Sequence, residues 1–133
     1  MEWEFLEQFR WGPPASRHQL PRRPEVQAAY EQFQRTHNMP ATIMQEVFVA
    51  PATVLRGWTL VPNKFPYAVA PGIEHWVLWL HPRKAWRDVE VLEFMIHWMR
   101  VYGFQAQNVI FFRIRPEHQS VKGIPHYHVF LRR

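Results

Sequence analysis

The segment at residues 75–80 is a nearly continuous apolar run, His-Trp-Val-Leu-Trp-Leu. A strand with one face in water alternates apolar and polar side chains, whereas an uninterrupted apolar run is typical of a strand covered on both faces. A chain with such a segment must place it between two layers that exclude water. We therefore expect residues 75–80 to form the central strand of a sheet with packing on both sides.

Residues 86–102 show the pattern of an amphipathic helix that would cover one face of this sheet. Apolar side chains recur there every three or four positions, at Trp86, Val89, Leu92, Ile96 and Met99. This spacing places them along one side of a helix. Gly103 follows the pattern directly, at the position where a left-handed residue commonly ends a helix. The segment is thus predicted to be the long helix of the core.

Shorter patterns complete the expected order of elements. Helices are predicted at residues 2–11, 24–37 and 41–48, and strands at residues 54–61, 109–112 and 124–131. Helices therefore come first, followed by two strands, the long helix and two more strands. This order predicts a single α+β domain, 1–133, with a mainly antiparallel sheet and one long packed helix. Residues 1–50 would be an N-terminal helical extension, and residues 51–133 the core.

The predicted C-terminal strand carries two histidines, His126 and His128, which alternate with apolar residues. Side chains two apart on a strand share a face, so both imidazoles would project to one side, together with Phe130. The other side would carry Tyr127, Val129 and Leu131. Two imidazoles on one rigid element suit the binding of a phosphate, a metal ion or a proton in transfer. They are equally compatible with a structural role as partners of buried polar groups.

Composition limits the classes of function. The chain has no cysteine, which excludes disulfides and thiolate metal sites. Its first residues are acidic where a signal peptide would be basic, and no apolar stretch reaches the length of a membrane span. These features predict a cytoplasmic protein without membrane insertion. The formal net charge of +5 favours anionic partners, with nucleotides and nucleic acids among them.

Residues 63–133 resemble a histidine-triad (HIT) domain. The resemblance is carried by Asn63-Lys64-Phe65-Pro66, Gly72 with His75, the predicted helix at residues 86–102, Gln119-Ser120-Val121 and His126-Tyr127-His128. Over the whole chain, the sequence is also similar to the fungal N-acetylglucosamine-induced protein family. That similarity is carried by Leu20-Pro21-Arg22-Arg23-Pro24-Glu25 with Tyr30, and by residues 63–79 and 120–129.

The HIT resemblance implies a HIT-like fold and a binding site for a nucleotide or nucleotide-sugar phosphate, without a metal ion or other cofactor. In such a site, His126 would attack the α-phosphate, His128 would be the third histidine of the triad, and His75 would orient the pair. The favoured activity is then phosphoester hydrolysis or nucleotidyl transfer. Ile124 stands where the first histidine of the triad belongs. A non-catalytic ligand-binding or regulatory module is therefore an alternative.

The resemblance also implies residues that bind the ligand. Gln119 and Ser120 would bind phosphate oxygens, and Asn63 would bind the ribose. From the sequence alone, three cations lie close enough to the histidine strand to add charge, and guanidinium groups can bind phosphate through two hydrogen bonds. These cations are Arg113, Arg115 and Lys122.

A different class of function is also compatible with the histidine pair. In metal-dependent H-x-H endonucleases, two histidines bind a divalent ion that polarises the scissile phosphate of single-stranded DNA. Such enzymes need a nucleophilic tyrosine, and only five residues follow His128. Tyr102 or Tyr30 would have to act as the nucleophile, although both precede the histidines in the sequence. In the HIT interpretation, by contrast, His75, His126 and His128 should lie together on one face of neighbouring strands.

Overall fold

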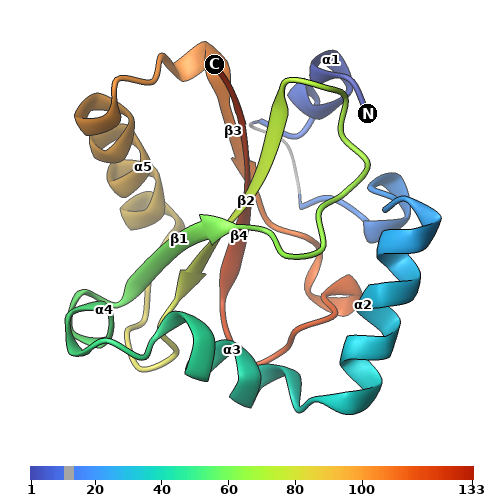
Figure 1. Ribbon diagram of the computed structural model, residues 1–133. Coiled ribbons are helices and arrows are strands. Elements are labelled where there is room, and N and C mark those ends of the chain that lie inside the picture. Colours follow the sequence, from blue (N-terminus) through green and yellow to red (C-terminus); the bar gives the residue numbers. More distant parts are fainter. Residues whose placement is uncertain (11–13) are drawn as a thin grey trace.

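The computed structural model describes residues 1–10 and 14–133. It has the predicted α+β fold, with a four-stranded sheet of order β1-β2-β4-β3 in which all neighbours are antiparallel (Figure 1). The strands are β1 (Trp58–Pro62), β2 (Ile73–Leu80), β3 (Val109–Phe112) and β4 (His126–Arg132). The prediction that residues 75–80 form a central strand is confirmed, because β2 lies between β1 and β4.

Within residues 1–10 and 14–133, five α-helices lie around the sheet. They are α1 (Trp3–Glu7), α2 (Pro24–Thr36), α3 (Met39–Val47), α4 (Pro51–Arg56) and α5 (Asp88–Tyr102). Short 3-10 turns lie at Arg17–Gln19, Ala106–Asn108 and Pro116–His118. Within the described ranges, no helix has both the length and the apolar character needed to cross a membrane.

Proline and glycine set the limits of these helices. Pro24 and Pro51 occupy the first turns of α2 and α4, where the helix requires no backbone N–H. Gly57 and Gly103 follow α4 and α5 with φ of 81° and 76°, a left-handed conformation that glycine adopts without strain. The predicted helix end at Gly103 is therefore confirmed.

Two predicted boundaries were wrong. The strand predicted for residues 54–61 begins only at Trp58, because Pro51 opens a helix that continues to Arg56. Pro51 at the first helical position favours a helix more strongly than the apolar Val54 and Leu55 favour a strand. Both of these apolar side chains remain exposed. The first helix ends at Glu7. Its predicted continuation is wrong for residues 8–10, which form a turn and a bend, and residue 11 lies outside the described residues.

Different helices cover the two faces of the sheet. α5 covers one face, in a buried cluster that contains Val91, Met95, Leu78, Tyr127, Val129 and Leu131. α1 covers part of the other face, in a cluster that contains Trp3, Leu6, Phe9, Ile110, Phe112 and Phe130. Figure 1 shows α5 on one side of the sheet, with α1 and α2 on the other. The alternation predicted along β4 is therefore confirmed, and its histidines lie on the face away from α5.

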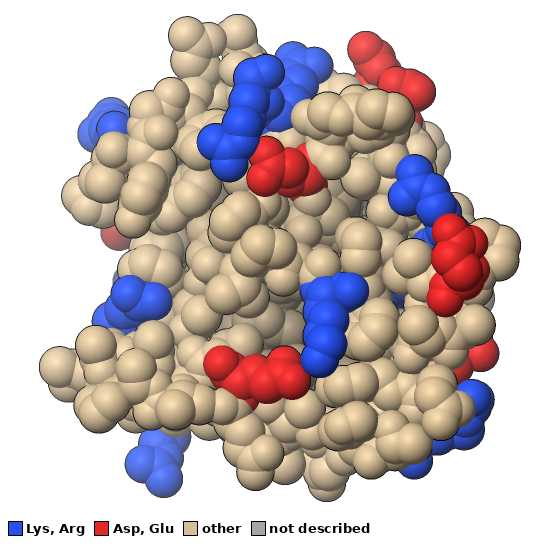
Figure 2. Space-filling view, in the orientation of Figure 1, with Lys and Arg blue, Asp and Glu red and all other residues tan. Residues whose placement is uncertain are grey.

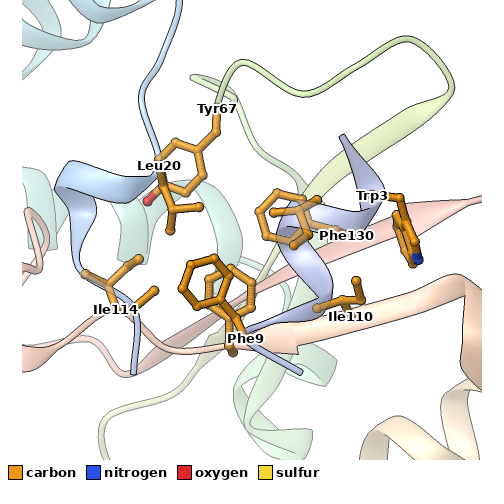
Figure 3. Packing of buried hydrophobic residues seen from close by; sticks show 10 residues of the cluster. Trp3, Phe9, Leu20, Tyr67, Ile110, Ile114 and Phe130 are labelled. Carbon is orange, nitrogen blue, oxygen red and sulfur yellow. The ribbon is translucent and has the colours of Figure 1, made fainter. Parts of the chain in front are cut away.

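The cluster beneath α1 ends at Tyr67, in the connection between β1 and β2. Figure 3 shows the Tyr67 ring beside Leu20, with its hydroxyl directed away from Phe130. Trp3 and Leu6, from the predicted extension, share this cluster with Phe130 of the predicted core. The division of the chain at residue 50 stays a prediction.

α2 stands apart from the sheet. Of its described residues, only Tyr30 is buried. The rings of Tyr30 and Phe33 reach across to Phe65, with centroid distances of 5.1 and 5.3 Å. α3 lies closer to the sheet, where Ile43 packs in a cluster with Val77. Side chains do not fill the space between α2 and the histidine face of the sheet, and this space forms a cavity.

Candidate functional site

A cavity of about 440 Å³ lies between the histidine face of the sheet, α2, α3 and the loop that precedes β4. Five of the predicted site residues line it, namely Asn63, Gln119, Ser120, His126 and His128. His75 is buried next to His128, as the β2–β4 register requires. The structure thus brings six of the nine predicted residues together, although they come from four separate segments of the chain.

A hydrogen-bond network connects His75 to its neighbours. The backbone N–H of Tyr67 donates to Nδ1 of His75 over 3.0 Å. Nε2 of His75 lies 2.9 Å from Nδ1 of His128. Nε2 of His128 lies 3.4 Å from the hydroxyl of Tyr67. The network therefore begins and ends at the same residue, Tyr67, and passes through two imidazoles.

The backbone donor fixes the protons of this network. Since Nδ1 of His75 accepts from a backbone N–H, a neutral His75 carries its proton on Nε2 and donates it to His128. His128 then accepts at Nδ1 and carries its own proton on Nε2, directed to the oxygen of Tyr67. The hydroxyl proton of Tyr67 is left for a further acceptor in the cavity, which Tyr67 also lines.

The side-chain amide of Asn63 is also oriented by a backbone donor. Its Oδ1 accepts from the backbone N–H of Phe65 over 2.8 Å, which fixes the side-chain amide with Nδ2 toward His75. Nδ2 lies 3.3 Å from Nε2 of His75, but that nitrogen already carries a proton and cannot accept. The Nδ2 protons of Asn63 are therefore available to a ligand in the cavity.

His126 is held in the opposite tautomer from His128. Its Nδ1 lies 2.8 Å from the carbonyl oxygen of Ile124, which can only accept, so Nδ1 carries the proton. Nε2 then keeps a free lone pair. Burial lowers the pKa of His126, with a smaller opposing effect of the Ile124 hydrogen bond, so the imidazole stays neutral. A neutral imidazole with a free Nε2 is the form required of a nucleophile or a general base.

Arg22 supplies a cation that the sequence-based site did not include. Its guanidinium lies over the rings of Tyr30 and Tyr67, 4.1 and 4.9 Å from their centroids. Its Nε donates to the carbonyl oxygen of Phe65 over 2.7 Å. Arg22 also lines the cavity, and withdrawal from water lowers its pKa. The ion pairs formed among the described residues do not include Arg22.

Arg22 could not be predicted from the sequence because nothing in the neighbouring residues distinguishes it from Arg23. The available signal was the run Leu20-Pro21-Arg22-Arg23-Pro24-Glu25, which carries part of the resemblance to the N-acetylglucosamine-induced family. Tyr67 was missed for a similar reason, since its role depends on a contact with His128, 61 positions away in the sequence. Burial raises the pKa of Tyr67 to about 12, so its hydroxyl keeps its proton and acts as a donor.

The remaining predicted residues have other contacts. The side-chain amide of Gln119 donates to the carbonyl oxygen of Ile114 over 3.0 Å, and the hydroxyl of Ser120 is hydrogen-bonded to that of Tyr30. Arg113 pairs with Asp88 over 3.3 Å and Arg115 with Glu117 over 2.6 Å. The three predicted cations are exposed and do not line this cavity. They are Arg113, Arg115 and Lys122.

Two further observations concern the metal-dependent alternative. Within the part of the chain that the structure describes, no three His, Asp or Glu side chains are grouped to hold a metal ion. Tyr102 is exposed at the end of α5, which covers the face of the sheet away from His126. Tyr30 lines the cavity, but its hydroxyl is hydrogen-bonded to Ser120.

We expect the folded protein to lose stability below pH 6.5. Burial lowers the pKa of both His75 and His128 well below 6.5, with smaller contributions from Arg22 and, for His128, from the other two histidines. The unfolded chain therefore takes up protons near pH 6.5 that the folded chain cannot, and stability present above that pH is lost as the pH falls.

The measurement is the urea midpoint of unfolding between pH 8 and pH 5. It should be flat above pH 7 and should fall below pH 6.5, with an uptake of roughly one proton each at His75 and His128 on unfolding. The variant His97→Asn, at an exposed position on α5, should show the same profile. A midpoint independent of pH down to pH 5 would contradict the buried neutral network.

Comparisons with known proteins give a family and a fold. A family model described as "Protein of unknown function (DUF3605)" matches residues 15–132. A solved structure titled "Crystal Structure of HTC1" is similar, with a TM-score of 0.59 and 23% sequence identity over 87% of this chain and 77% of that chain. At this identity, the likeness concerns the fold alone. The search of curated proteins returned no match.

Proposed function

Because the chain belongs to the DUF3605 family, whose description names no activity, we propose its function from its own site. The protein binds a nucleotide or nucleotide-sugar phosphate in the cavity beside His126, and it hydrolyses or transfers the phosphoester through that histidine. A cytoplasmic location, where such ligands are abundant, is part of the same proposal.

The observation that carries this proposal is the guanidinium of Arg22, which hydrogen-bonds to uncharged groups of Phe65 and Gln27 and forms no ion pair with a described carboxylate. His126, whose Nε2 carries no proton, lines the same cavity. A cation taken out of water without a counter-ion is costly, and proteins normally pair it. No described carboxylate forms an ion pair with Arg22, and two tyrosine rings hold it in place. An anionic ligand would complete the pair.

Two hydrogen-bond donors of the cavity suit a phosphate, and the lining also includes Glu31 of α2 and Glu46 of α3, the latter paired with Lys64. Nδ2 of Asn63 and the hydroxyl of Tyr67 are donors whose protons the network leaves free, and both residues line the cavity. Phosphate oxygens accept such hydrogen bonds strongly. Figure 2 shows the charged surface side chains dispersed over the face in view, with several cations beside acidic groups, rather than gathered into one basic surface. This dispersion favours a small anion in the cavity over a long nucleic acid on that face.

The size and apolar walls of the cavity suit a nucleoside. Its volume of about 440 Å³ falls within the range of about 300–1,000 Å³ that is common for small-molecule sites. Phe33 and Met39 line the end nearest α2 and α3, and Trp79 lines the sheet. A base can stack on or pack against such side chains. The identity of the base and sugar is not part of the proposal.

The chemistry follows from the tautomer of His126. The Nε2 lone pair attacks phosphorus, an N–P bond forms, and the P–O bond to the leaving group breaks. The leaving oxygen keeps the electron pair of that bond and takes a proton from water. Water or another hydroxyl then attacks phosphorus, the N–P bond breaks, and Nε2 recovers its lone pair while the proton of the attacking hydroxyl passes to solvent. Arg22 would neutralise charge on the phosphate oxygens, and Asn63 would donate hydrogen bonds to them.

The departure from the HIT pattern at Ile124 does not remove the orientation of the nucleophile. The carbonyl oxygen of Ile124 accepts the Nδ1 proton of His126, so the backbone at this position fixes the tautomer whatever its side chain. This hydrogen bond is the reason why we favour an enzyme over a non-catalytic module. A HIT-like mechanism is thus part of the proposal.

The test compares ligands that differ only in the phosphate. Nucleoside monophosphates should raise the melting temperature, whereas the same nucleosides without phosphate should have little effect, because Arg22 lacks its counter-ion. At a ligand concentration 100 times Kd, the stabilisation would be about 2.7 kcal/mol. Purine and pyrimidine pairs should both be tested, with calorimetry to obtain Kd. Equal shifts of the melting temperature with nucleoside and nucleotide, or no shift with either, would contradict the proposal.

A further inference from the structure

The corner of the molecule at α4 carries three exposed apolar side chains. Leu55 is 88% exposed, Val49 71% and Val54 42%. Val54 and Leu55 belong to α4, which Figure 1 shows at one corner of the fold, beside the start of β1. In Figure 2, the same corner is a projection of uncharged side chains. A leucine so exposed stands out into solvent.

Three exposed cations adjoin these apolar side chains. Arg56 is the last residue of α4, and Arg83 and Lys84 lie in the connection between β2 and α5. The backbone N–H of His81 donates to the carbonyl oxygen of Gly57 over 2.9 Å, which ties this connection to the end of α4. A Cβ placed on Gly57 would come within 2.8 Å of Cδ of Lys84, so the side chain of Lys84 crosses the end of α4. We call the six residues the α4 corner; they are Val49, Val54, Leu55, Arg56, Arg83 and Lys84.

The α4 corner has an excess of positive charge. The ion pairs formed among the described residues include none of its three cations. The neighbouring carboxyl of Glu90 pairs with Arg87 over 3.1 Å. Hydrogen bonds from Arg87 are the main cause of the lowered pKa of Glu90, and the charge of Lys84 contributes least. The excess charge favours an anionic partner.

The aromatic side chains beside the α4 corner pack inward. The rings of Trp58 and Trp86 both pack on Phe94 of α5, with centroid distances of 4.6 and 6.3 Å. Cζ of Arg56 lies 3.9 Å from the centroid of the Trp58 ring, and Nε of Arg56 donates to the Trp58 carbonyl oxygen. Protein interfaces depend mostly on aromatic anchor side chains, which this corner does not turn outward. A contact with lipid headgroups, by contrast, uses aliphatic side chains flanked by cations.

We propose that the α4 corner docks on membranes whose surface contains anionic phospholipids. Leu55 and its apolar neighbours enter the headgroup region, and the three cations bind the lipid anions. Such a contact is peripheral and needs no spanning segment, so the apolar length considered in the sequence does not bear on it. None of the six residues lines the main cavity, so this inference is independent of the proposed function.

The test is co-sedimentation with vesicles of phosphatidylcholine, alone or with about 30% phosphatidylserine. Wild type should bind only the vesicles that contain phosphatidylserine. Leu55→Ser should weaken this binding roughly tenfold, the scale of one leucine side chain returned to water, whereas Leu55→Phe should keep it. The double variant Arg83→Gln, Lys84→Gln should weaken it roughly thirtyfold, or about fivefold for each cation. Sodium chloride at about 0.5 M should also weaken it, because salt screens exposed charges.

The matched controls are Val101→Ser on α5 and the double variant Arg35→Gln, Arg100→Gln, all at exposed positions away from α4. Both controls should bind the vesicles as wild type does. If wild type does not bind, if phosphatidylcholine alone binds it equally, or if the controls lose as much affinity as the corner variants, the proposal is overturned.

Two further outcomes would also reject the membrane contact. Binding that the double variant Arg83→Gln, Lys84→Gln loses but Leu55→Ser keeps would show that the apolar side chains play no part. If a soluble helical peptide of Glu and Leu binds wild type where vesicles do not, and Leu55→Ser binds that peptide less tightly, the α4 corner serves a protein partner instead.

Discussion

Replacing His126 with alanine is expected to abolish phosphoester turnover while leaving nucleotide affinity within a few-fold of wild type. In the proposed mechanism, Nε2 of His126 is the group that forms the covalent bond, and among the described side chains that line the cavity no other imidazole is held by a backbone carbonyl. Loss of a nucleophile lowers kcat on the order of a thousandfold or more. We expect binding to depend mainly on Arg22 and on the donors of Asn63 and Tyr67, which the substitution leaves in place.

The measurement is product release from a set of nucleotide-sugars, followed by chromatography, with Kd obtained by calorimetry on the same preparations. His97→Ala serves as the control, since His97 is exposed on α5. EDTA should not change the rate, because covalent histidine catalysis needs no metal ion. If wild type binds nucleotide yet turns over no faster than His126→Ala, the protein is a binding module. Cleavage of single-stranded DNA that EDTA stops would instead favour the metal-dependent nuclease.

Replacing Arg22 with methionine should remove most nucleotide binding. Methionine keeps an unbranched apolar stem but has no charge, so the phosphate would lose its cation and up to two charge-assisted hydrogen bonds, each worth about 1.5–3 kcal/mol. Affinity should fall on the order of a hundredfold. The ligand-free protein should lose little stability, because the desolvated charge disappears together with the hydrogen bond to Phe65.

Thermal unfolding with and without nucleotide separates these two effects. The adjacent Arg23→Met is the matched control, since Arg23 is exposed and lies outside the lining of the cavity. Arg22→Lys should recover only part of the affinity, because an ammonium group lacks the planar fork of a guanidinium. A ligand-induced shift in Arg22→Met equal to that of wild type would show that Arg22 does not hold the phosphate.

Much of the fold could be predicted from the sequence because its main elements have strong periodic patterns. The uninterrupted apolar run of β2, the helical spacing of α5 and the alternation along β4 each specify an element and the faces that it buries. The weaker pattern around Val54 failed, since an apolar residue between Pro51 and Gly57 suits a short helix as well as a strand. There the proline and the glycine decided the outcome.

The site was predictable only where one element or one register brings residues together. His126 and His128 share a strand face, and the apolar runs of β2 and β4 place His75 beside His128. Arg22 enters from a loop before α2, whose position depends on packing between segments far apart in sequence. The tautomers of the histidines could not be predicted from the sequence either, because they depend on individual backbone groups of Tyr67 and Ile124.

The connection from Tyr67 to His75 carries an evolutionary constraint. Both the backbone N–H and the hydroxyl of Tyr67 take part in the histidine network, so this residue must keep its place relative to β2 and β4 at once. An insertion or deletion between Tyr67 and His75 would shift one end of the network and break it. Related sequences that retain the site should therefore conserve the eight-position spacing between these two residues, while the chain segments outside the network remain free to vary in length.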